Sequence, residues 1–272
     1  MRGLRVLALG ILTAFSTPLH SGSALEVMQT RSDMLGWEAV GRLDLPSGFC
    51  TGVLIARDLV LTAAHCLFDR TAATQIDIHG AVFRAGYLNG QSLFERRVIS
   101  YRMSRDFQYN GPVMMAKDAA LDVAVLRLDR PVSHEEAAPF LIHNGRQTPD
   151  QVQVMSYGRG REQSMSWQPA CNVLRQSTQL WEFDCDTTFG SSGAPVFAME
   201  EGAIRILSLV SGNWQTQDGS NRTIGMKLGD LVATLSAQVK GTTRPVSRAP
   251  TGAKRITVGQ NRPANGAKFL KP

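Results

Sequence analysis

The stretch FCTGVLIARDLVLTAAHC, residues 49–66, decides the fold class of this 272-residue chain. Two apolar runs, 48–55 and 59–62, flank the short polar turn 56–58. Runs of this kind joined by a short turn are typical of a β-hairpin. The hairpin leads directly into His65 and Cys66, so a side chain that can move protons follows the strand pair.

Further β-like runs continue along the chain, separated by turn residues. They cover residues 75–78, 98–101, 123–128, 152–156, 204–211 and 223–227. Only residues 230–239 show helical spacing of their apolar positions. Many short strands and one terminal helix predict an all-β sandwich or barrel. We expect the polar, proline-containing stretch 139–151 to separate two β units of similar size.

The net charge of +6 lies at the two ends of the chain. Residues 25–240 carry 20 basic and 23 acidic side chains, so the central part is slightly acidic. A content of 43% hydrophobic and 19% charged residues is that of a globular protein rather than a disordered one. Because the central part has no excess of basic residues, we expect no nucleic-acid partner.

The first 24 residues have the features of a secretory signal peptide. Arg2 and Arg5 precede the apolar run 6–15, and small residues lead up to Ala24, after which we expect cleavage. An uncleaved membrane anchor is the alternative, but the run is too short to cross a bilayer of about 30 Å as a helix. We therefore expect a secreted or periplasmic protein with no membrane span after removal of the signal.

The basic segment 241–272 is expected to be a flexible tail. It combines seven lysine and arginine residues with proline, glycine and threonine, and it has no acidic residue. Contact with an anionic surface is one role for such a tail, and simple solvation is the other. We expect the protein to be a monomer.

The four cysteines agree with export to an oxidising compartment. Three pairings are possible on paper, and closeness in the sequence favours Cys50–Cys66 and Cys171–Cys185. Each bridge would close a loop of about 15 residues, which corresponds to about 3 kcal/mol of stabilisation. A zinc site is the alternative, but the chain has no Cys-x-x-Cys pair. We expect no metal and no cofactor.

Three stretches carry chemically reactive residue types. They are TAAHC at 62–66, DVAVL at 122–126 and GSSGAP at 190–195. Each alone has an ordinary structural explanation, namely a packed histidine, a turn-capping aspartate or a glycine-rich loop. The order His65, Asp122, Ser192 excludes α/β-hydrolases, which run Ser, acid, His, and subtilisin-like enzymes, which run Asp, His, Ser.

Together these stretches resemble the signatures of the chymotrypsin-like (trypsin-type) serine peptidases, over residues 36–240. The GSSGAP form is most similar to the bacterial secreted trypsin-like and glutamyl-endopeptidase-like branch. The resemblance implies two six-stranded antiparallel β-barrels with a C-terminal helix. It also implies a secreted serine endopeptidase that acts on protein or peptide substrates.

On this resemblance, His65, Asp122 and Ser192 would form a catalytic triad. A serine hydroxyl is a poor nucleophile, so His65 would take its proton while Asp122 orients the imidazole. The backbone N–H groups of Gly190 and Ser192 would form the oxyanion hole, and Gly193 would permit the tight turn. Asp118 is the rival acid, but it lacks the DVAVL context.

The sequence departs from the trypsin-type pattern at the position before Ser192. Trypsin-type zymogens have an aspartate there, which pairs with a new N-terminal amine after cleavage, whereas this chain has Ser191. No IVGG-like start precedes Trp37, so activation by that salt bridge is not expected. Residues 25–35 would be either a short propeptide, with Arg31 as the cut site, or an N-terminal arm.

Substrate preference depends on Asp186, for which two interpretations remain open. Six residues before Ser192, it matches by count the acid that gives trypsin-like enzymes their preference for Arg or Lys. Alternatively, Asp186 braces the disulfide loop next to Cys185. Ser211 and Gly212 are expected to offer backbone groups to an extended substrate. Residues 209–214 contain no histidine, which disfavours glutamyl specificity.

Two other functions are alternatives to the endopeptidase. One is a catalytically weak or inactive binding module that acts through the basic tail, and the other is an esterase. The complete set of triad residues favours an enzyme, because a protein of this fold that has lost its activity commonly lacks one of them.

Overall fold

The computed structural model describes residues 23–241 of the chain. Most of the predicted signal peptide and the tail from residue 242 onward lie outside this range. No helix within residues 23–241 is long and apolar enough to cross a membrane.

The first β-barrel contains the predicted hairpin. In the order in which its strands pair, it consists of β2 (Val40–Leu45), β3 (Gly48–Ala56), β4 (Leu59–Thr62), β7 (Ala124–Leu128), β6 (Phe94–Met103) and β5 (Val82–Ala85). Every pairing is antiparallel, and the barrel closes where β5 pairs with β2. The strands and turns of the hairpin fall where the sequence predicts them.

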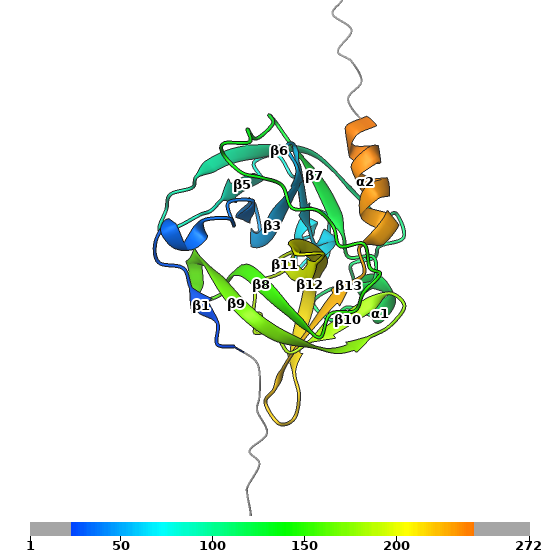
Figure 1. The fold of residues 1–272 in the computed structure, drawn as a ribbon. Coiled ribbons are helices and arrows are strands. Elements are labelled where there is room, and N and C mark those ends of the chain that lie inside the picture. The colour runs from blue at the N-terminus through cyan, green and yellow to red at the C-terminus, as the bar shows by residue number, and fades with distance from the viewer. Residues whose placement is uncertain (1–22, 242–272) are drawn as a thin grey trace, which may run out of the picture. The chain divides into compact units, whose positions relative to one another are not determined.

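The second barrel follows after the connection 129–150 (Figure 1). In pairing order, it consists of β8 (Gln151–Gly158), β9 (Arg161–Gln176), β10 (Leu180–Phe183), β13 (Asn221–Met226), β12 (Ala203–Gln215) and β11 (Pro195–Glu200). It closes because β8 pairs with both β9 and β11. The fold is therefore the predicted pair of six-stranded antiparallel barrels, followed by the C-terminal helix α2 (Gly229–Gly241).

One predicted strand is wrong. Residues 75–78 form no strand, and only Gln75 makes an isolated bridge, to Phe68. Ile76 instead donates its N–H to the carbonyl of Leu67, which holds the segment against the loop that carries His65. The alternation of isoleucines at 76 and 78 therefore reflects packing of a loop rather than a sheet.

Several short elements carry no clear signal in the sequence. They are the strand β1 (Glu26–Val27), the helix α1 (Ala116–Ala119) and the 3-10 helices η1 (Ser32–Met34) and η2 (Ala64–Leu67). Strands β2, β5, β9, β10 and β11 were also not predicted, although β9 (Arg161–Gln176) is the longest strand. Strands gain much of their stability from packing against neighbouring strands rather than from local propensity.

A shared hydrophobic cluster joins the two barrels. It includes Val53 and Leu61 of the first barrel and Met155 and Phe197 of the second. Buried side chains of α2, such as Leu235, belong to the same cluster. Each barrel also has its own core, so the cleft between them lies on well-packed walls.

Both predicted disulfides are present. Cys50–Cys66 joins β3 to η2, and Cys171–Cys185 joins β9 to the loop after β10. The first bridge closes the segment that ends in the TAAHC motif and thereby holds the residues next to His65.

Residues 25–35 pack on the barrels as an arm. Strand β1 pairs with β9, and Met28 and Met34 are both buried in the shared cluster. The Arg31 guanidinium, at the predicted cut site, donates hydrogen bonds to the backbone carbonyls of Gly86 and Gln91. A cut at Arg31 would therefore remove buried contacts of the folded chain.

Candidate active site

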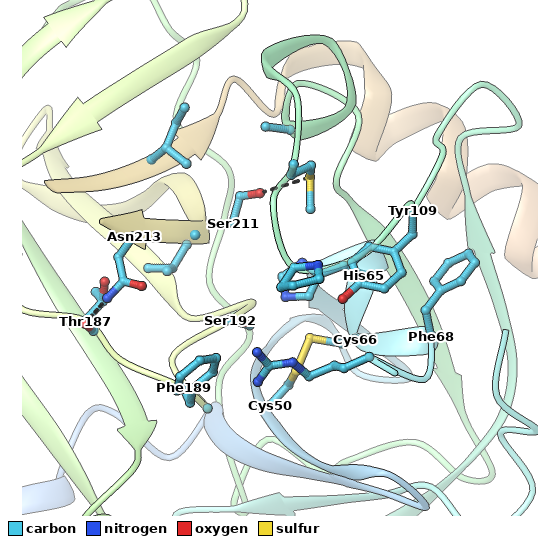
Figure 2. A pocket seen from close by; sticks show the side chains of 18 of the residues that line it. Cys50, His65, Cys66, Phe68, Tyr109, Thr187, Phe189, Ser192, Ser211 and Asn213 are labelled. Atoms are coloured by element: carbon cyan, nitrogen blue, oxygen red, sulfur yellow. Dashed lines mark hydrogen bonds between the residues drawn. A yellow bond between two sulfur atoms is a disulfide. The ribbon is translucent and has the colours of Figure 1, made fainter. Parts of the chain in front are cut away.

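Five of the predicted site residues line a cleft of about 540 Å³ that takes lining from both barrels: His65, Gly190, Ser192, Ser211 and Gly212. His65 and the Cys50–Cys66 disulfide come from the first barrel, whereas Ser192 and Ser211 come from the second (Figure 2). Within this lining no residue is an aspartate or a glutamate. No group of His, Cys, Asp and Glu residues within 23–241 is arranged to hold a metal ion.

His65 and Asp122 form a close pair. Nδ1 of His65 lies 2.7 Å from Oδ2 of Asp122, and the His65 backbone N–H donates to Oδ1 at 2.8 Å. Asp122 is fully buried, so its carboxylate needs these donors. Because a carboxylate only accepts, Nδ1 must carry the imidazole proton, which leaves Nε2 free to act as a base.

Ser211 is the third partner of the Asp122 carboxylate. Its hydroxyl donates to Oδ2 at 2.5 Å, from a bulge where the pairing of β12 with β13 shifts register. Sequence reasoning expected only backbone contacts from Ser211, so this side-chain role is new. Asp118, the rival acid, instead lies 3.3 Å from Nζ of Lys117.

Ser192 lines the cleft, and its hydroxyl has no hydrogen-bond partner within residues 23–241. Catalytic hydrogen bonds often tighten only when substrate binds. In the loop around Ser192, two glycines lie where the backbone comes too close to neighbouring residues to leave room for a side chain. Gly190 and Gly193 have φ values of +93° and +75°, and a Cβ at Gly193 would lie 2.1 Å from Thr62 Oγ1.

The Phe189–Gly190 and Ser191–Ser192 peptides each use their carbonyl group in a hydrogen bond and leave their N–H group without a partner among the described residues. The Phe189 carbonyl accepts from the Arg159 N–H at 2.7 Å, and the Ser191 carbonyl accepts from the Ala194 N–H at 2.9 Å. In a trans peptide the following N–H points to the opposite side. The N–H groups of Gly190 and Ser192 are thus unbonded within the described chain, and both residues line the cleft.

Thr51 ties this loop to the first barrel. Its backbone N–H donates to the Ser192 carbonyl at 2.9 Å, and its hydroxyl donates to the Gly190 carbonyl at 2.9 Å. The same hydroxyl accepts the Tyr157 N–H at 3.0 Å. Thr51 is fully buried, so each of these bonds is protected from water. The sequence placed Thr51 in the hairpin but gave no sign of this role.

A half-buried arginine supports the loop from the second barrel. Arg161 donates from Nη1 to the Ser156 carbonyl at 2.6 Å, and from Nη2 to the hydroxyls of Ser156 at 3.0 Å and Ser191 at 3.2 Å. Burial lowers the pKa of Arg161 to about 10. Ser191, the residue that replaces the zymogen aspartate, is therefore held by a side chain of the folded chain itself.

The part of the cleft that the second barrel lines, here called the pocket beside Ser192, has uncharged walls. Its lining includes Thr187, Val210, Asn213 and Ile224. The Asn213 amide donates to the Thr187 carbonyl, as Figure 2 shows.

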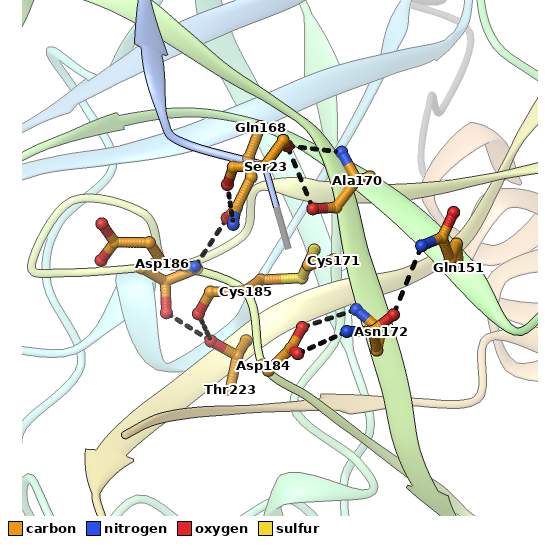
Figure 3. The surroundings of a disulfide bond; sticks show 11 residues. Ser23, Gln151, Gln168, Ala170, Cys171, Asn172, Asp184, Cys185, Asp186 and Thr223 are labelled. Atoms are coloured by element: carbon orange, nitrogen blue, oxygen red, sulfur yellow. Dashed lines mark hydrogen bonds between the residues drawn. A yellow bond between two sulfur atoms is a disulfide. The ribbon is translucent and has the colours of Figure 1, made fainter. Parts of the chain in front are cut away.

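Asp186 lies outside this pocket. Its side chain is exposed, and Oδ1 accepts a hydrogen bond from Asn221 at 3.0 Å. Its backbone N–H donates to Gln168 at 2.7 Å, beside the Cys171–Cys185 disulfide (Figure 3). Successive side chains of an extended chain point to opposite sides, so Thr187, and not Asp186, points toward the pocket. This position favours the interpretation in which Asp186 braces the disulfide loop over the one in which it is the acid at the base of the pocket.

Tyr109 is a further cleft residue that the sequence did not suggest. Its ring stacks near the His65 imidazole, with 6.2 Å between ring centroids. Burial raises the pKa of Tyr109 above 10, so it remains a neutral phenol at physiological pH.

This arrangement agrees with comparisons to known proteins. A family model described as "Trypsin-like peptidase domain" matches residues 50–204, more than half of the chain. The chain belongs to the trypsin-like peptidase family. Comparison with curated protein sequences finds no match.

Similar solved structures include three proteases. The structure of a Glu endopeptidase in complex with MPD has a TM-score of 0.63 at 15% identity and covers 79% of this chain and 97% of that chain. The thermostable serine protease AL20 from an extremophilic microorganism has a TM-score of 0.59 at 18% identity and covers 75% and 97%. Protease Anisep from Arthrobacter nicotinovorans has a TM-score of 0.59 at 16% identity and covers 75% and 96%. At identities this low, the similarity to these structures shows the fold alone.

Proposed function

We propose that this protein is an exported serine endopeptidase with His65, Asp122 and Ser192 as its triad. The observation that carries the proposal is the 2.7 Å contact of the buried Asp122 carboxylate with His65 in the cleft that Ser192 also lines. Export is supported by the two disulfides and by the signal-like N-terminus.

In the proposed reaction, Ser192 Oγ attacks the scissile carbonyl as Nε2 of His65 takes its proton. The carbonyl oxygen gains negative charge next to the N–H groups of Gly190 and Ser192. The imidazolium, stabilised by Asp122, then protonates the leaving amine and an acyl-enzyme remains. Water, activated by His65 in the same way, attacks the acyl carbon and releases the acid and free Ser192.

The proposal is tested with a fluorophosphonate probe, which phosphonylates activated serines. We expect the native, oxidised protein to be labelled and the Ser192→Ala variant to remain unlabelled. Ser236→Ala, in helix α2, is the matched control and should label like the wild type. Absence of labelling of the wild type would favour the binding module. Labelling and ester hydrolysis without digestion of casein would favour the esterase.

We further propose that the residue before the scissile bond is uncharged and of small or medium size. The pocket beside Ser192 has neither a carboxylate nor a basic group, and two of its lining residues, Asn213 and Thr187, are bonded to each other. Charged side chains would lose hydration there without gaining a partner. This replaces the expected preference for Arg or Lys, since Asp186 bonds to Asn221 outside the pocket.

Cleavage of a peptide library tests the preference. We expect uncharged residues before the cut, with the same profile for the Asp186→Ala variant. Enrichment of Arg and Lys that disappears in Asp186→Ala would contradict the proposal. Enrichment of glutamate would also contradict it and would align this protein with the Glu endopeptidase of similar fold.

A further inference from the structure

An exposed aromatic ring at the edge of the cleft is held between two arginines. Phe189 is 45% exposed and immediately precedes Gly190. The Arg70 guanidinium carbon lies 4.1 Å from the ring centroid, and that of Arg159 lies 4.0 Å from it. Both guanidinium groups lie within cation–π distance of the same ring. A phenylalanine therefore fixes two positive charges beside the oxyanion donors.

Neither arginine is locked in an ion pair. Within residues 23–241, Arg70 and Arg159 form no salt bridge. Arg70 interacts with the Tyr109 side chain, and Glu162 attracts Arg159 while it accepts the N–H of Gly160. Both arginine side chains are exposed, and a guanidinium carries five donors, so donors remain for a ligand.

The two arginines come from different barrels and meet on one side of Ser192. Arg70 follows η2 in the first barrel, and Arg159 lies in the turn between β8 and β9. An acyl group bound along Ser211 to Asn213 leaves the departing peptide on the other side of Ser192, near Cys50–Cys66 and Phe189. Figure 2 shows Ser192 between these two groups of side chains.

We propose that Arg70 and Arg159 bind a carboxylate of the departing peptide, within the first three residues after the scissile bond. A guanidinium matches a carboxylate with two parallel hydrogen bonds, and the stacked ring holds both guanidinium groups in place before substrate arrives. The absence of acidic residues from the cleft lining favours the same ligand. This inference rests on the proposed peptidase activity and adds a determinant of substrate choice.

The test uses the full-length, oxidised protein and quenched-fluorescence peptides built on a sequence that it cleaves. The peptides differ only in having Glu or Gln at one of the first three positions after the cut, and their C-termini are amidated. We expect kcat/KM to be about 10-fold higher for the best Glu peptide than for its Gln counterpart, equivalent to about 1.4 kcal/mol. A matching set with a free C-terminus shows whether the terminal carboxylate can replace the side chain.

Variants identify the groups responsible. In the Arg70→Gln/Arg159→Gln variant the Glu to Gln ratio should fall to about 1, and the double Lys variant should restore part of it. Arg175→Gln, an exposed arginine of β9, is the matched control and should keep the ratio. At high salt the wild-type ratio should also fall, because exposed charges are screened.

The inference is overturned if the wild type cleaves peptides with no preference for an acid, or if the preference survives in the double Gln variant. The proposed function has its own readout, which is labelling of Ser192 by the fluorophosphonate. Labelling without an acid preference refutes this inference alone. Absence of both labelling and cleavage refutes the peptidase, and the inference with it.

Discussion

Replacing Thr51 with valine tests whether the first barrel holds the serine loop in its active shape. Valine keeps the shape of threonine but removes the hydroxyl that joins the Gly190 carbonyl to the Tyr157 N–H. Both groups would be left buried without that partner, at about 1–3 kcal/mol each. We therefore expect Thr51→Val to lower the free energy of unfolding by about 2–6 kcal/mol.

The same change should slow the proposed chemistry. Loss of one complete oxyanion donor costs about 100- to 1,000-fold in kcat in well-studied hydrolases. Thr51→Val loosens the Gly190 position without removing its N–H, so we expect a smaller loss. The rate of fluorophosphonate labelling and of activated-ester hydrolysis should fall by about 10- to 100-fold.

Ser208→Ala is the control for the loss of a buried hydroxyl. Ser208 is fully buried and donates to the Met226 carbonyl at 2.7 Å, within the second barrel and away from the serine loop. Urea unfolding followed by tryptophan fluorescence should show about 1–2 kcal/mol of destabilisation, with an unchanged labelling rate. If Thr51→Val also leaves the labelling rate unchanged, Thr51 stabilises the fold without shaping the site.

Three further predictions concern other parts of the chain. The backbone N–H of Ser133, and then Arg96, hold the pKa of Glu136 below its ordinary value of 4.5. The contribution of Glu136 to stability is therefore complete above about pH 4.5 and is lost as pH falls through the folded-state pKa. For Glu136→Gln, the free energy of unfolding in urea should fall less steeply between pH 6 and pH 3, and at pH 7 it should be about 1 kcal/mol lower than in the wild type. Arg161→Gln should cost about 2–3 kcal/mol in urea unfolding and slow fluorophosphonate labelling, and a variant with an unchanged labelling rate would remove Arg161 from the support of the serine loop. Removal of residues 25–35 should cost about 4 kcal/mol or more, because two buried methionines are lost; higher activity after their removal would instead identify them as a propeptide.

Much of the fold follows from local patterns. The hairpin 48–62 and the helix near 230–239 have apolar spacing that is visible within one segment, and both form as predicted. The failed strand at 75–78 and the missed strands show the limit of that reasoning. A strand is stable only with a neighbour, and its neighbour can lie far away in the sequence.

For this protein, the sequence alone determined the residue types of the site and both disulfide pairings. His65, Asp122 and Ser192 each stand in a short motif, and each cysteine has its partner within 16 residues. These features depend on local constraints such as a glycine turn or a short closed loop, and local constraints are legible in one stretch of chain.

Only the tertiary structure decided which side chains surround that site. Asp186 could be counted from Ser192, but its direction depends on strand register, where a shift of one residue turns a side chain to the other face. Thr51 and Arg161 support the serine loop from distant segments, and Arg70 and Arg159 meet on Phe189 across the two barrels. Contacts of this kind arise when the barrels pack together, and no pattern within a single segment encodes them.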